Sequence, residues 1–278
     1  MATKKPASAG KRTASTPRKS ATAAKKSTTR VTSRAAAVSP RSYFTSVGNF
    51  MKAPLMAASA AEFIGTFLLA AIGLIVWSAD PNYTLFTLIP IVLLVVALSG
   101  AHLNPVVTFG ALATRRVNLT RASAYIVAQV LGALLAFAMM TGFINAVPDT
   151  GNGLVQSTPS LFTAAELPKN SEWLLVSTEL VGAIIFAFAV AGALKLGKSG
   201  VTYALTYAGG LYVALILVRT VASYVSGTAI LNPALAAPFQ ALSWQVWPIV
   251  IYVVAPLVGG VIGFGLNDLL QKKEVATR

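Results

Sequence analysis

Two short stretches decide the fold: SGAHLNPV at residues 99–106 and SGTAILNPA at residues 226–234. Each follows a long apolar run, begins with Ser-Gly and ends with Asn-Pro and a small residue. Pro suits the first position of a helix, where its missing N–H is not needed, and Asn before it is a favourable N-cap. Each stretch is therefore predicted to be a loop that turns into a short helix at its Asn. Because hydrocarbon tolerates irregular backbone only where it is buried or lines a wet cavity, the pair indicates a polar route through a membrane.

The composition is typical of a polytopic helical membrane protein. Of 278 residues, 55% are hydrophobic and only 11% are charged, which is too apolar for a soluble domain. The chain has no cysteine for a disulfide or a thiolate metal site, and its single His cannot build a His-rich metal centre. We find no nucleophile–base constellation and no phosphate-binding Gly loop. We therefore expect no enzyme, no metal and no cofactor.

Basic residues gather at the N-terminus. Residues 1–52 hold twelve of the 22 Lys and Arg residues and no acid, and residues 1–42 have almost no large apolar side chain. Such a segment cannot bury enough apolar surface to offset its ordering entropy, so we predict a disordered basic tail over 1–52. We expect the tail to contact anionic lipid. Nucleic-acid binding is the alternative from charge alone, although no aromatic residue before Tyr43 offers a base-stacking platform.

Apolar runs predict six membrane spans. The two Asn-Pro helices, near 104–114 and 232–242, follow the second and fifth spans and are too short to cross alone, since a span needs about 20 residues. Most Lys and Arg residues of the loops fall on the same side as the tail, which the positive-inside rule makes cytoplasmic. We thus expect a multi-pass protein of the cell membrane (plasma or inner) with both termini inside. The approximate bounds of the spans are 57–79, 84–100, 121–144, 173–195, 201–224 and 245–268.

The chain also repeats itself. AEFIGT at 61–66 opens the first span, and TELVGA at 178–183 recurs in the fourth. Three spans per repeat give the two halves opposite topologies, the inverted-repeat plan with its site near the midplane. We predict one membrane domain over 53–272, with repeat one at about 57–144 and repeat two at about 173–268, and a short C-terminal tail over 273–278.

At this point the sequence resembles the aquaporin (major intrinsic protein) family across about residues 55–270. The resemblance rests on the motifs at 61–66 and 99–106, on AQVLGA at 128–133, on Glu179, and on Asn232-Pro233-Ala234. It implies an all-α membrane fold of six transmembrane helices and two re-entrant half-helices arranged as an inverted repeat. It also implies a homotetramer with one water pore in each subunit. The half-helix tips would be Asn104 with Pro105 and Asn232 with Pro233, whose amides would offer N–H donors to a single file of water.

Water that enters such a route must replace the hydrogen bonds it leaves in bulk. Besides the Asn donors, bare carbonyls at Gly100–Leu103 and Thr228–Leu231 can supply acceptors, and we count His102 and Ala229 among the pore-lining residues. His102 is expected to be a packed loop residue or a polar group beside a gate. Glu62 and Glu179 are costly in hydrocarbon. The resemblance gives them the role of holding the two loops through backbone N–H groups, in preference to proton transfer.

The constriction departs from the family pattern. The family usually has Arg after the second Asn-Pro-Ala, where this chain has Leu235. Arg219 lies eight residues before Gly227 within an apolar run, and we hypothesise that it restores the missing charge from the facing wall of the pore. The alternative is that Arg219 snorkels to the headgroups or pairs with an acid. On the second span, Thr84, Phe86 and Thr87 are all candidates for the constriction, and Phe86 is counted as pore-lining.

These observations favour a passive channel for water. The alternative within the class is a channel for glycerol or other small neutral solutes, because loss of the usual Arg could widen the filter. A tethering protein that uses its membrane body only to anchor the basic tail belongs to another class. An ion-coupled transporter lacks support, since beyond the two Glu and Arg219 no membrane-embedded pair suggests coupling.

Overall fold

The computed structural model describes residues 54–77, 81–146, 160–195 and 199–276. The predicted basic tail over 1–52 lies outside these residues. Every regular element within them is helical, and six stretches are long and apolar enough to cross a membrane, as the sequence predicts. The first five stretches belong to α2 (Pro54–Val76), α3 (Pro81–Ser99), α5 (Leu119–Asn145), α6 (Glu172–Ala193) and α7 (Gly200–Ser223).

The sixth span is a single run made of three helical pieces. It consists of α9 (Val246–Ile249), the π-helical segment η1 (Val250–Val254) and α10 (Ala255–Ala276). Pro256 has no N–H to donate to the Tyr252 carbonyl, and the N–H of Ala255 instead donates to the Val250 carbonyl, five residues back. The wider turn accommodates the proline without ending the helix. The sequence prediction of a continuous sixth span is correct, but it missed this change of geometry.

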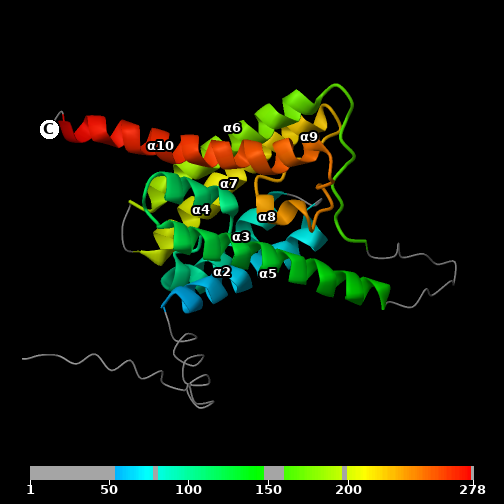
Figure 1. The fold of residues 1–278 in the computed structure, drawn as a ribbon, viewed down its shortest axis with the longest axis horizontal. Coiled ribbons are helices and arrows are strands. Elements are labelled where there is room, and N and C mark those ends of the chain that lie inside the picture. Colours follow the sequence, from blue (N-terminus) through cyan, green and yellow to red (C-terminus); the bar gives the residue numbers. More distant parts are fainter. Residues whose placement is uncertain (1–53, 78–80, 147–159, 196–198, 277–278) are drawn as a thin grey trace, which may run out of the picture.

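The two short helices lie inside the bundle. Figure 1 shows α4 (Pro105–Ala113) and α8 (Pro233–Ala236) between the α2–α5 pair and the α6–α10 pair. The prediction extended the second half-helix to about residue 242, whereas α8 ends at Ala236. Pro238 explains the difference, because it cannot donate the next helical hydrogen bond to the Ala234 carbonyl. The chain continues in turns, in which the Phe239 N–H donates to the Leu235 carbonyl over 2.9 Å.

The two halves of the chain share one way of packing their helices. A Cβ on Gly132 of α5 would collide with the Phe63 carbonyl of α2, and a Cβ on Gly259 of α10 would lie 2.7 Å from the Leu180 carbonyl of α6. Phe63 and Leu180 each follow a motif Glu, and Gly132 and Gly259 each take the fourth place in two similar stretches, QVLGA at 129–133 and PLVGG at 256–260. Both repeats therefore use the same glycine to bring a long helix pair into backbone contact, as small residues do in membranes.

The two ends of the bundle carry different side chains. At one end, called here the Asp268 end, Oδ1 of Asp268 accepts from Arg116 over 2.8 Å and from Lys195 over 2.6 Å. These contacts tie the residues after α4 and α6 to α10. At the other end, called the Trp77 end, Phe162 donates its N–H to the Leu74 carbonyl, and Ala164 donates to the Phe239 carbonyl. The chain around 160–171 therefore joins the end of α2 to the turn after α8.

Candidate functional site at the two Asn-Pro tips

Each half-helix begins at an Asn, as the sequence predicts. The Asn104 side chain accepts from the Val106 N–H over 2.9 Å, and the Asn232 side chain accepts from the Ala234 N–H over 3.1 Å. Pro105 and Pro233 fill the first helical positions, where no N–H is needed. Each Asn thus uses its side-chain oxygen as the N-cap and keeps its NH₂ group for another partner.

The two tips meet in the interior. Nδ2 of Asn104 donates to the Leu231 carbonyl over 2.8 Å, and Nδ2 of Asn232 donates to the Leu103 carbonyl over 3.2 Å. Residues 104 and 232 are both buried. Each amide therefore binds the loop of the other repeat, so two segments 127 residues apart form one cross-linked site.

Two buried carboxylates hold the loops that lead to these tips. The Glu62 oxygens accept from the N–H groups of His102 and Leu103 over 2.8 and 2.6 Å. The Glu179 oxygens accept from Ile230 and Leu231 over 2.5 and 2.9 Å. Each carboxylate lies on the opening helix of its repeat and binds the two residues before the Asn-Pro pair. Charge-assisted bonds of this kind are the stronger ones in proteins.

These carboxylate bonds hold strained backbone. Leu103 and Leu231, which directly precede the two Asn residues, have φ values of 53° and 56°. A side chain other than Gly pays about 1–3 kcal/mol in such a region and persists there only when its surroundings determine it. The strained turn directs each Leu carbonyl to the Asn amide of the other loop. The Glu contacts that hold the turn therefore also fix the geometry of the tips.

The two loops are not held equally. In the first repeat, Nε2 of Gln129 donates to Glu62 over 2.7 Å and to the Thr108 hydroxyl over 3.0 Å. Nδ1 of His102 lies 3.1 Å from the same hydroxyl, and the imidazole packs edge-on against the Tyr125 ring. Gln129 lies three residues before Gly132, and the residue three before Gly259 is Pro256, which has no side-chain donor. His102 is buried, and its ring contacts Thr108 on α4 and Tyr125 on α5.

The predicted ladder of bare carbonyls is wrong in the first loop, defined as residues 100–104. It also fails at both ends of Thr228–Leu231, where Thr228 accepts from the Tyr252 hydroxyl over 3.1 Å and Leu231 accepts from Asn104. The Tyr203 hydroxyl donates to the Ala101 carbonyl over 3.3 Å, and the Tyr207 hydroxyl donates to the His102 carbonyl over 2.5 Å. The Leu103 carbonyl accepts from Asn232. Tyr203 and Tyr207 both come from α7 and were missed by sequence reasoning. The available signal was a pair of phenols four residues apart in an apolar span, where an unpaired hydroxyl is costly.

Arg219 lies at the Trp77 end. Its guanidinium donates to the Trp77 carbonyl, at the end of α2, and stacks 5.4 Å from the centre of the Trp77 ring. Trp77 and Phe162 both pack on Phe239, which follows α8, with ring centres 5.0 and 4.9 Å apart. Arg219 therefore reaches from α7 to an aromatic cluster beside the second half-helix.

The other predicted filter residues differ in position. Leu235 and Ala229 are both buried, in α8 and in the loop before it. Phe86 is 70% exposed on α3 and shares an outward face with Leu93, Leu94 and Leu98, so its assignment as pore-lining is wrong. Thr84, another of the three candidates, is only 6% exposed and faces the interior. Thr84 and Phe86 are about half a helical turn apart, and the sequence alone did not fix which face of α3 is inward.

A protein-family comparison matches residues 49–266 to the family described as Major intrinsic protein. Aquaporin Z of Rhodopseudomonas palustris is 33% identical over 172 residues, which cover 60% of this chain and 68% of that protein. The glycerol uptake facilitator protein-like 6 of Lactiplantibacillus plantarum is 28% identical over 214 residues, covering 73% of this chain and 92% of that protein.

Other similarities cover less of the sequence or only the fold. Aquaporin-1 of Bos taurus is 42% identical over 64 residues, covering 23% of this chain and 24% of that protein. Among solved structures, the aquaglyceroporin from Plasmodium falciparum aligns with a TM-score of 0.58 at 21% identity, covering 81% of this chain and all of that one. At that identity, the structural match supports the fold.

Proposed function

Since the chain belongs to the major intrinsic protein family of membrane channels, we propose that it is a passive channel for water. The observation that carries the proposal is the meeting of Asn104 and Asn232 in the interior. Each amide nitrogen has two hydrogens and uses one on the opposite loop, so the second can donate to a passing water oxygen. Water that binds both amides in turn replaces part of its lost hydration.

We expect the same tips to exclude cations. The N-terminus of α4 carries the positive end of its helix dipole, and both amides present hydrogens to the route. A cation beside the amides would face their N–H donors, whereas water can accept from them through its oxygen. Glu62 and Glu179 have their oxygens directed to loop N–H groups, which supports a holding role for both.

Arg219 is our candidate for the residue that narrows the route at the Trp77 end. Leu235 follows the second Asn-Pro-Ala and offers no charge or donor. The Arg219 guanidinium instead extends from α7 to Trp77 on α2, beside the aromatic cluster that packs against the turn after α8. A fixed cation in this place would repel cations and donate to a passing oxygen. These contacts favour the filter hypothesis over a surface role for Arg219.

The alternative is a channel for glycerol or other small neutral solutes. The relatives include one named aquaporin Z and one named a glycerol uptake facilitator-like protein, so similarity supports both substrates. Leu235 in place of Arg would leave a wider, more apolar constriction, which favours a solute with carbon atoms. An Arg219 side chain in the filter would narrow the constriction and make it more polar, which favours water.

Purified protein in liposomes tests the proposal by stopped-flow light scattering. Under a mannitol gradient, we expect vesicles with protein to shrink faster than protein-free vesicles of the same size. Under a glycerol gradient, a water-selective channel gives rapid shrinkage and slow reswelling, whereas a solute channel gives rapid reswelling. The proposal would be overturned if vesicles that contain folded protein shrank no faster than protein-free vesicles.

We extend the proposal to the setting of the channel. We infer a homotetramer in the cell membrane with both termini on the cytoplasmic side, where the basic tail contacts anionic lipid. Support for the orientation comes from the Asp268 end, which brings Arg116 and Lys195 together on the side that the charge pattern makes cytoplasmic. Protease accessibility of the tail in right-side-out vesicles tests the orientation, and cross-linking in native membrane tests the tetramer.

A further inference from the structure

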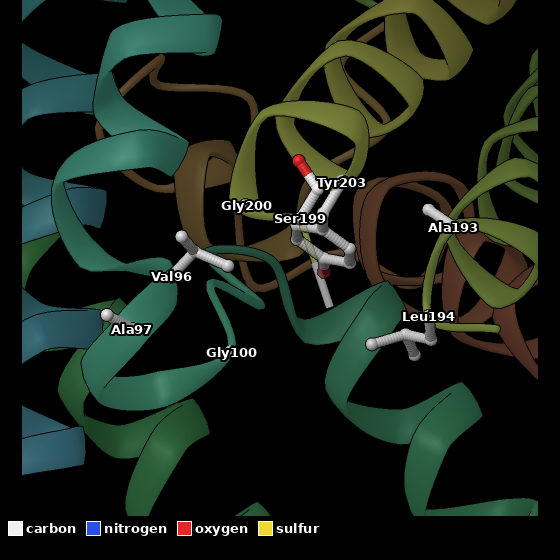
Figure 2. A pocket seen from close by; sticks show the side chains of 8 residues that line it. All are labelled: Val96, Ala97, Gly100, Ala193, Leu194, Ser199, Gly200 and Tyr203. Atoms are coloured by element: carbon white, nitrogen blue, oxygen red, sulfur yellow. The ribbon is translucent and has the colours of Figure 1, made fainter. Parts of the chain in front are cut away.

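A pocket of about 280 Å³ opens beside the first loop, toward the Asp268 end. The end of α3 contributes Val96 and Ala97, the end of α6 contributes Leu194, and the start of α7 contributes Ser199 and Tyr203. Figure 2 shows the Tyr203 side chain between the segment that carries Val96 and Gly100 and the one that carries Leu194. The pocket therefore leads from one end of the bundle to the residues that precede the Asn104 tip.

Beyond the pocket, three successive carbonyls of the first loop already have donors. Counted toward the tip, Ala101 accepts from Tyr203, His102 accepts from Tyr207, and Leu103 accepts from Asn232. Tyr203 is 5% exposed and Tyr207 is 1% exposed. The hydroxyls thus occupy the acceptors that a molecule between the pocket and the Asn tips would use.

We infer that Tyr203 and Tyr207 form a second constriction, and that permeation through the first-loop half of the channel is limited there. The inference rests on the proposed function. A molecule passes only when each tyrosine hydroxyl leaves its loop carbonyl. The molecule must then accept a hydrogen bond from the hydroxyl and donate one to the carbonyl. Water and alcohol hydroxyls can do so because they donate and accept. A solute without this double capacity leaves a buried group unpaired, which is costly.

The packing of the two rings fits a barrier that moves as a pair. Tyr207 meets the edge of Phe186 on α6 with ring centres 5.1 Å apart, and Tyr203 lies 5.9 Å from Tyr207. Both phenols are on one face of α7, four residues apart. Each is anchored at its hydroxyl by a single loop carbonyl, so removing the hydroxyl frees the ring while leaving its volume in place.

Tyr125 offers a matched control. It is a buried phenol that donates to a carbonyl of the same region, Ser99, over 2.8 Å. It comes from α5, however, its ring packs on the His102 imidazole, and it is not among the residues that line the pocket. If the phenols only brace the loop, Tyr125→Phe and Tyr207→Phe should have the same effect. If Tyr207 limits passage, Tyr207→Phe should raise water permeability and Tyr125→Phe should not.

The experiment measures osmotic water permeability per folded protein in liposomes for wild type, Tyr203→Phe, Tyr207→Phe and Tyr125→Phe. We expect Tyr203→Phe and Tyr207→Phe each to raise permeability about fivefold, the change expected from losing one neutral hydrogen bond. Tyr125→Phe should leave it unchanged or lower. Thermal denaturation of each variant in detergent reports folding separately.

The outcomes distinguish this inference from the proposed function. Suppose that wild type conducts water faster than protein-free vesicles do. If the α7 variants are then no more permeable than wild type, the constriction is overturned while the water channel stands. If Tyr207→Phe does not fold, Tyr203→Phe at the pocket decides the question by the same comparison. Permeability no higher than in protein-free vesicles for every folded variant would overturn the proposed function itself.

Discussion

We propose that Arg219 supplies, from α7, the charge that is missing after the second Asn-Pro-Ala. Its guanidinium binds the Trp77 carbonyl and stacks on the Trp77 ring, which holds a planar cation at the end of α2. Leu235, at the position where the family usually has Arg, is buried and apolar. Charge therefore reaches this end of the site from α7.

Replacing Arg219 with Ala is expected to increase glycerol uptake relative to water flux by on the order of tenfold, which corresponds to removing about 1.4 kcal/mol of barrier. The physical reason is the loss of both bulk and fixed charge beside the aromatic cluster. Stopped-flow reswelling in glycerol measures the ratio. Arg219→Lys is the control, because it keeps the charge but loses the planar stack. An unchanged ratio in folded Arg219→Ala protein would rule out a filter role.

The two Glu residues allow a second test at the same scale. Glu62→Gln and Glu179→Gln each replace one acceptor oxygen with an NH₂ group that faces a backbone N–H. We expect each to lower the free energy of unfolding by about 1–3 kcal/mol. Glu62→Gln should cost more, because Glu62 also accepts from Gln129. Thermal denaturation in detergent checks the order, and a larger loss for Glu179→Gln would contradict this account.

At the scale of elements, sequence reasoning found what short motifs encode. The six spans, both Asn-Pro helix starts and the repeat follow from apolar runs, capping residues and recurring Glu, all of which act locally. The length of α8, the π segment η1, the inward face of α3 and the tyrosine contacts depend on tertiary packing. Phe86 illustrates the limit: an almost wholly apolar helix has too little polar periodicity to show which side is buried.

The helix pairs give a prediction of their own. Gly132→Ala would place a Cβ against the Phe63 carbonyl, so α2 and α5 must separate, and we expect a loss of about 1–3 kcal/mol in stability. Gly142, in the same α5 helix, has open space within 4 Å of the position that an added Cβ would take, and it serves as the matched control. Gly142→Ala should be neutral or stabilising, since Ala favours helix. Equal denaturation temperatures for both variants would refute close packing at Gly132.

At the scale of the whole molecule, the described residues contain every contact used to explain permeation. The Asn tips, the Glu contacts, Arg219 and the tyrosines all lie between residues 54 and 276. The basic tail precedes them and carries most of the net charge of +14. Transport and membrane-surface contact are therefore assigned to different parts of the chain.

Deleting residues 1–42 is accordingly expected to leave water flux per folded protein unchanged. The same deletion should weaken binding of the detergent-purified protein to anionic vesicles, by roughly 1 kcal/mol for each basic residue that lies near the surface. Vesicles of neutral lipid are the control. A large drop in flux after the deletion, in protein that still folds, would contradict this division and show that the tail belongs to the channel.

The central claim is that water passes between two asparagine amides in the middle of the molecule. A high-resolution density map of the purified protein in lipid tests it most directly. We predict an ordered water at about 3 Å from Nδ2 of both Asn104 and Asn232, with further water toward the Trp77 end. A map in which the two amides lie apart, or in which side chains fill the space between them without water, would contradict the account.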